Sequence, residues 1–102
     1  MTNERLTALL VDRVLGWKVC PDRFIKSGRS WIPRWRFEPL LRLEDAFLLL
    51  DKAASSYLLS VDEEGVFTAE VRVGDRLGRA SGEPKARTIS LAISLALGIG
   101  TV

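Results

Sequence analysis

Residues 56–81 read SYLLSVDEEGVFTAEVRVGDRLGRAS, and the predicted fold class rests on this segment. Two turn sequences, at 63–65 and 74–75, divide it into three short segments. In the middle segment every second residue is apolar: Phe67, Ala69, Val71 and Val73. Because successive side chains of a strand point to opposite faces, this alternation predicts an antiparallel meander with one buried face.

Helical periodicity predicts three helices around this meander, at about 2–15, 43–54 and 85–97. Gly16 follows the first helix and Gly98 the last, at positions where a left-handed residue commonly ends a helix. The last helix is apolar on nearly all sides, so most of its surface has to be covered.

The region between the first two helices, 17–39, is interrupted by prolines and by the Ser27-Gly28 pair. It can therefore hold only short extended pieces, around 17–20, 24–25 and 30–32. The resulting element order is α-β-(β)-α-β-β-β-α, which belongs to the α+β class with helices packed on a small antiparallel sheet. With 102 residues, the chain is expected to form a single domain over 1–102.

Composition limits the chemistry that is available. The chain has no histidine, and its one cysteine, Cys20, is expected to be a small packing residue. Nucleophile pairs of the Ser/His or Cys/His type are therefore excluded, and no zinc-ligand spacing is present. The acids at 62–64 occupy a turn, where solvated carboxylates are common. We therefore expect no enzyme, no cofactor and no metal site.

The longest uncharged run, 88–102, is too short to span a bilayer. The N-terminal residues also lack the charged-then-apolar pattern of a signal peptide. These features predict a soluble cytoplasmic protein that does not interact with membranes, in the host cytoplasm if a phage encodes it.

Charge is unevenly distributed along the chain, although the formal net charge is only +2. Cations dominate 23–42, acids dominate 44–70, and the segment 72–87 is basic again. This separation suits an anionic partner or head-to-tail self-association, unless folding intersperses the charges.

The strongest candidate for a binding site is the segment WIPRWRF at 31–37. Its candidate ligand-binding residues are Trp31, Arg34, Trp35 and Arg36. Aromatic rings can stack on bases and guanidinium groups can grip phosphates, so the segment fits a nucleotide or a single-stranded nucleic acid. The alternative is that the aromatic side chains pack on the sheet while the arginines face water.

A second candidate surface lies on the last helix, where a narrow small-residue stripe interrupts the apolar side chains. Its residues are Ala86, Ser90, Ser94 and Leu97. Because the sheet covers only one side of such a helix, we expect this stripe to meet a second copy in a homodimer.

Three stretches resemble the phage ABA sandwich domain family: LVDRVLGWK at 10–18, LEDAFLLLDK at 43–52 and ARTISLAISLALG at 86–98. Phe47 stands where that family usually has tryptophan. The resemblance implies phage or prophage origin and a three-layer α-β-α sandwich, and the family has no established catalytic residues to transfer. Residues 57–97 also resemble the β-β-β-α unit of HicB-type antitoxins, at the level of topology.

These observations favour a non-enzymatic phage or prophage accessory protein that binds or sequesters a partner, such as a host-defence protein or a nucleotide signal. That hypothesis predicts a pocket near 31–36. A nucleic-acid-binding or HicB-antitoxin-like module would instead present a continuous positive face. A purely structural or assembly protein would present a large apolar interface.

Overall fold

The computed structural model describes residues 2–99, which form three α-helices and two three-stranded antiparallel sheets. In chain order the helices and strands are α1 (Asn3–Leu10), β1 (Lys18–Val19), β2 (Arg23–Ser27), β3 (Ser30–Pro33), α2 (Leu43–Ala53), β4 (Ser56–Val61), β5 (Phe67–Val73), β6 (Arg76–Ser81) and α3 (Lys85–Leu97). A π-helical turn, Val11–Leu15, extends α1, and a 3-10 turn, Arg34–Arg36, follows β3. The predicted α+β class is confirmed, and the element order roughly matches the prediction, with three strands instead of one or two between α1 and α2.

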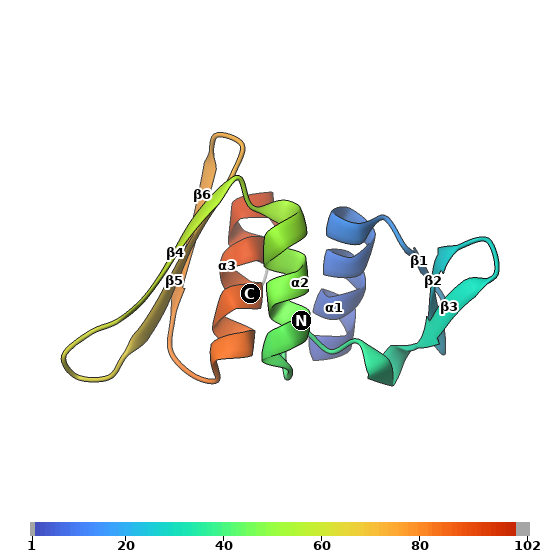
Figure 1. Cartoon of the computed structure of the whole chain (residues 1–102), viewed down its shortest axis with the longest axis horizontal. Helices are drawn as coiled ribbons and strands as arrows, with labels where there is room; N and C mark the ends of the chain where they lie inside the picture. The colour runs from blue at the N-terminus through green and yellow to red at the C-terminus, as the bar shows by residue number, and fades with distance from the viewer. Residues whose placement is uncertain (1, 100–102) are drawn as a thin grey trace.

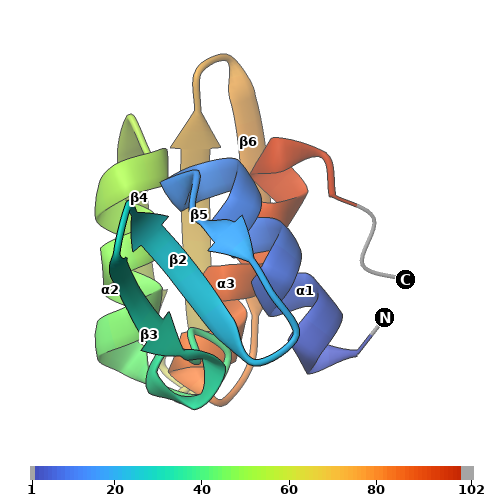
Figure 2. The same ribbon diagram turned by 90° about the vertical axis from the view of Figure 1, so that its right-hand side faces the viewer.

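The helices lie between the two sheets (Figure 1). Sheet β4-β5-β6 forms one end of a molecule that measures 47 × 26 × 24 Å, and sheet β1-β2-β3 forms the other. Figure 2 shows β2 and β3 crossing in front of the helices when the molecule is seen from that second end. This layering corrects the α-β-α sandwich expected from the resemblance. The short strands of 18–33 pair with each other instead of joining the meander, so they cover the helix layer from the opposite side.

An aromatic cluster joins the small sheet to the helices. Phe24 of β2 is fully buried, and its ring lies 6.4 Å from that of Phe37 in an edge-on arrangement. The half-buried ring of Trp17 lies 5.4 Å from Phe37. Only one of the three tryptophans therefore packs into this cluster, because Trp31 and Trp35 are exposed.

The meander has the predicted alternation. Phe67, Ala69 and Val71 of β5 are buried, while the residues between them are more exposed. Helix α3 packs against β5 and β6. At Gly78 of β6 the approach is so close that a Cβ atom would collide with the backbone carbonyl oxygen of Ala92. Only glycine fits there, so this residue sets the spacing between sheet and helix.

The small-residue stripe of α3, which was predicted to form a dimer interface, is instead largely buried within the chain itself. Ala86 is 4% exposed and both Ser90 and Ser94 are 0% exposed, while Leu97 is half-buried. The Ser90 hydroxyl donates a 2.8 Å hydrogen bond to the carbonyl oxygen of Pro39. Other parts of the same chain, including α2 and the loop around Pro39, therefore cover the face that was expected to meet a second copy.

Helix ends follow the sequence signals. Thr2 accepts a 3.1 Å hydrogen bond from the Arg5 N–H at the start of α1. Gly16 and Gly98 have φ values of 68° and 76°, the left-handed conformation expected after a helix. Within residues 2–99 no helix combines the length and apolarity needed to cross a membrane.

Candidate binding groove

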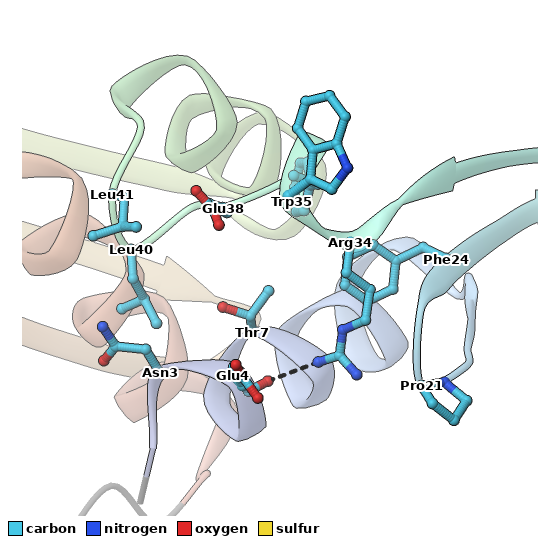
Figure 3. A pocket seen from close by; sticks show the side chains of 11 residues that line it. Asn3, Glu4, Thr7, Pro21, Phe24, Arg34, Trp35, Glu38, Leu40 and Leu41 are labelled. Carbon is cyan, nitrogen blue, oxygen red and sulfur yellow. Dashed lines mark hydrogen bonds between the residues drawn. The ribbon is translucent and has the colours of Figure 1, made fainter.

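A surface groove of about 450 Å³ lies where the first turn of α1 faces the 3-10 turn and the loop before α2 (Figure 3). We call it the groove. Its lining residues are Asn3, Glu4, Thr7, Pro21, Phe24, Arg34, Trp35, Phe37, Glu38, Leu40 and Leu41. The floor is apolar because Phe24, Phe37 and Leu40 are buried there, and the rim is exposed.

The local sequence explains why a turn forms at this place. Pro33 has a φ of −60°, and the chain then turns so that the Phe37 N–H donates to the Arg34 carbonyl oxygen at 3.2 Å. The Arg34 N–H also donates to the Asp22 carbonyl oxygen at 3.2 Å. The turn is thereby fixed to the start of β2, and Phe37 is directed into the core while Trp35 faces solvent.

Arg34 holds the groove together. Its guanidinium group donates to the backbone carbonyl oxygens of Cys20, at 3.3 Å, and Glu4, at 3.1 Å. The same group lies 5.1 Å from the centre of the Phe24 ring. Figure 3 shows the bond that reaches across to α1. Because two carbonyls and an aromatic face engage it, Arg34 holds the groove wall in place.

The rim combines apolar surface with acidic groups. Trp35 in the 3-10 turn is 63% exposed, and Leu41, shortly before α2, is 62% exposed. The carboxylates of Glu4 and Glu38 also line the groove. The rim thus offers flat and branched apolar contacts beside negative charge.

The structure separates the four predicted ligand-binding residues. Arg34 and Trp35 line the groove, whereas Trp31 and Arg36 do not. Arg36 is exposed, with its guanidinium carbon 5.8 Å from the Trp35 ring. Trp31 lies on β3, where it is directly opposite Ile25 of β2. The segment 31–37 therefore contributes to two different surfaces.

The second surface is the outer face of sheet β1-β2-β3. Register places Lys18, Ile25 and Trp31 on one face, and Arg23 shares it because it lies two residues before Ile25. The guanidinium carbon of Arg23 lies 4.2 Å from the centre of the Trp31 ring, which is 48% exposed. We call this the basic sheet face.

Arg23 also pairs with an acid at the edge of the basic sheet face. Its Nη2 lies 2.8 Å from Oδ2 of Asp22. Hydrogen bonding to the Arg23 side chain lowers the pKa of the Asp22 carboxyl group below its usual value. The same bond raises the pKa of Arg23 above its usual value, so both groups keep their charges.

Sequence reasoning missed the groove residues on α1 and in the loop before α2. Asn3 follows the Thr2 cap at the start of α1, and its Oδ1 accepts a 2.8 Å hydrogen bond from the Arg87 side chain of α3, which anchors this end of the groove. Thr7 is buried against the groove, and Leu41 is an exposed leucine directly after the buried Leu40. The adjacent leucines were the available signal, since a pair outside a helix often has one member that faces solvent.

Cys20 is half-buried, in keeping with a packing role. Among residues 2–99 there is no group of three or more Cys, Asp or Glu side chains arranged to hold a metal ion.

The fold is similar to that of a solved protein. The 2.0 Å crystal structure of a phage protein from Bacillus cereus ATCC 14579 superimposes with a TM-score of 0.82. The alignment covers 100% of this chain and 93% of that one, at 16% sequence identity. No protein-family model matches the sequence, and no curated protein matches it. The α+β architecture is therefore one that a phage protein also adopts, and membership of the ABA sandwich family stays a prediction.

Proposed function

We propose that the protein is a phage or prophage accessory protein that acts by binding rather than catalysis, and that the groove takes a short segment of a partner protein. The segment would present an apolar side chain next to a lysine or arginine. The observation that carries this proposal is the pairing of exposed Trp35 and Leu41 with the carboxylates of Glu4 and Glu38 around one groove. The likeness to a phage protein supports the association with phage.

Shape and chemistry support an apolar anchor. A concave site with an apolar floor and a few polar groups at its rim is the usual form of a ligand pocket. Tryptophan is enriched among the residues that dominate binding energy. The buried Phe24, Phe37 and Leu40 provide a floor that an inserted apolar side chain can contact.

Charge favours a basic partner over the nucleotide signal considered from the sequence. The groove has two carboxylates, on Glu4 and Glu38, while its one guanidinium group is engaged by the Cys20 and Glu4 carbonyl oxygens. A phosphate entering the groove would meet two carboxylates and one guanidinium group, and the net negative charge of this lining disfavours an anion. A lysine or arginine on the partner would be attracted instead.

The test is selection from a random peptide display library on the immobilised protein. We expect enriched peptides that carry an aromatic or branched apolar residue beside a lysine or arginine. Trp35→Ala should weaken their binding by about 30-fold, the usual loss of about 2 kcal/mol for a central tryptophan. Leu41→Asp should reduce it to background.

Leu95→Asp is the matched control, because Leu95 is 45% exposed on α3 and does not line the groove. It should bind the selected peptides as the wild type does. Enrichment of acidic peptides, or equal binding by Leu41→Asp and the wild type, would rule out the proposed function.

The basic sheet face favours a second candidate function, binding of single-stranded nucleic acid. Trp31 offers a partly exposed ring for base stacking, with the Arg23 guanidinium group stacked 4.2 Å from its centre and Lys18 on the same face. Fluorescence anisotropy with labelled oligothymidylate should then show binding that weakens steeply with salt. Trp31→Ala should lose this binding while Trp35→Ala keeps it. No binding at low salt would exclude this candidate.

A further inference from the structure

Strand β4 is an open edge of sheet β4-β5-β6. Its residues, SYLLSV at 56–61, include no proline, lysine or other charged residue, and its register with β5 runs through six pairs without a bulge. Proline, charged side chains and bulges are the features by which proteins normally block strand edges, and β4 has none of them. The other edge strand, β6, carries Arg76 and Arg79.

Every second side chain of β4 lies on the helix side of the sheet, at the edge of the helix layer. Tyr57, Leu59 and Val61 lie opposite Val71, Ala69 and Phe67, on the face that α3 covers. Helix α3, however, packs on β5 and β6, so Tyr57 stays 47% exposed and Val61 58% exposed. This apolar row continues the core face and is only partly covered within residues 2–99, since Leu59 is half-buried against the core while Tyr57 and Val61 remain exposed.

The hydrogen-bond pattern shows which backbone groups of β4 point outward. The Asp62 N–H donates to the Val66 carbonyl oxygen at 3.1 Å. Antiparallel pairs alternate between bonded and non-bonded, so the even-numbered residues of β4 bond to β5. The N–H and C=O groups of Tyr57, Leu59 and Val61 therefore face away from the sheet.

We propose that β4 is the docking surface for a second copy of this chain, and that two copies pair antiparallel through β4 about a two-fold axis at Leu59. The outward groups of Leu59 bond to those of Leu59 in the other copy, and Tyr57 pairs with Val61. The two meanders then form one six-stranded sheet whose apolar rows meet at the axis. A two-fold contact of this kind closes on itself and leaves no free edge at β4.

Charge complementarity supports this partner and this direction of pairing. With Leu59 opposite itself, Asp62 of one copy lies opposite Ser56 of the other, and Ser56 is paired with Arg72. The acidic turn at 62–64 is thus brought within two strand spacings, about 10 Å, of the exposed Arg72, which forms no ion pair within residues 2–99. A parallel pairing would instead place the two acidic turns together.

Disulfide trapping tests the pairing and its register, in a Cys20→Ser background of the full chain. Directly opposite residues of a bonded antiparallel pair have Cα atoms about 5.5 Å apart, within the range for a disulfide. Leu59→Cys should therefore form a covalent dimer on mild oxidation. Leu58→Cys is the control, because Leu58 is more exposed, at 60%, but lies off the axis on the opposite face. Equal or faster trapping of Leu58→Cys would overturn the proposal.

Sedimentation velocity of the chain without added cysteines gives an independent readout. Dimer should accumulate as concentration rises toward about 1 mM, a range that reveals even a small, weak interface. Arg72→Glu should raise the dimer Kd at least about tenfold, and adding Glu63→Lys and Glu64→Lys should restore association. Arg13→Glu, which changes net charge equally away from β4, should have no effect. A monomer at every concentration would overturn the proposal, whatever the groove binds.

Discussion

Ser90 and Ser94 offer a sharp test of how the fold supports the groove. Both are fully buried on α3, but their hydroxyl groups have different partners. Ser90 donates over 51 residues of chain to the Pro39 carbonyl oxygen, at 2.8 Å, whereas Ser94 donates to the Leu91 carbonyl oxygen one turn back in its own helix. Pro39 is itself fully buried. Replacing Ser90 with alanine therefore leaves a buried carbonyl without a donor, and replacing Ser94 does not.

The expected magnitudes follow from these partners. An unsatisfied buried carbonyl costs about 1–3 kcal/mol, so Ser90→Ala should lower the free energy of unfolding by that amount. Ser94→Ala should change it by less than about 0.5 kcal/mol, because the Leu91 carbonyl remains inside the helix. The gain in helix propensity from alanine is the same at both positions and cancels in the comparison.

Urea unfolding followed by far-UV circular dichroism measures both variants. For a domain of this size each 1 kcal/mol corresponds to a Tm shift of about 4–8 °C, so thermal scans should separate the two as well. Equal destabilisation by the two substitutions, or a larger effect at Ser94, would refute the reasoning. Such a result would mean that Ser90 does not hold the loop that forms the groove rim.

Three further predictions concern single positions. Gly78→Ala should destabilise the protein by about 1–3 kcal/mol in the same urea assay, since the added methyl group collides with the Ala92 backbone, and wild-type stability would contradict that contact. Arg34→Ala should cost about 0.5–1.5 kcal/mol, because it removes hydrogen bonds to the part-buried Cys20 carbonyl and the exposed Glu4 carbonyl; an unchanged unfolding midpoint would show that the guanidinium group is not engaged. Arg23→Ala should raise the pKa of Asp22 toward its usual value in an NMR titration. Any stability that this pair contributes should be present above the carboxyl pKa of the unfolded chain and should be lost as pH falls through the lower pKa of the folded protein. An Asp22 pKa that does not move in the variant would exclude the pairing.

Local pattern was sufficient to predict the helices and the meander. The alternation in β5 and the glycines after α1 and α3 act within a few residues, and the structure follows them closely. The layering could not be predicted in the same way. The strands between Lys18 and Pro33 are two to five residues long, and nothing in so short a segment specifies whether it pairs with its neighbours or joins the meander.

The burial of α3 shows a related limit. Its nearly uniform apolarity correctly indicated that several sides are covered, but not what covers them. The cover includes α2 and the loop around Pro39, which lies 51 residues before Ser90, and such long-range contacts leave no periodic signal. A second copy was the simpler inference from the sequence alone.

The candidate site could be predicted only in part, because some of its residues come together only through long-range contacts. The aromatic and basic composition of 31–37 marked the right segment, and Trp35 and Arg34 do line the groove. The 3-10 turn after Pro33 then directs Trp31 and Trp35 to different surfaces. Thr7, on α1, joins the groove only through folding.

The measurement that tests the proposed function most directly is an ¹H–¹⁵N spectrum of the indole N–H groups, recorded while a display-selected peptide is added. The chain has three tryptophans, so the spectrum separates the aromatic cluster, the basic sheet face and the groove. We predict that the Trp35 signal moves with saturation while those of Trp17 and Trp31 stay in place. A shift of Trp31 alone, with Trp35 unmoved, would contradict the assignment of binding to the groove.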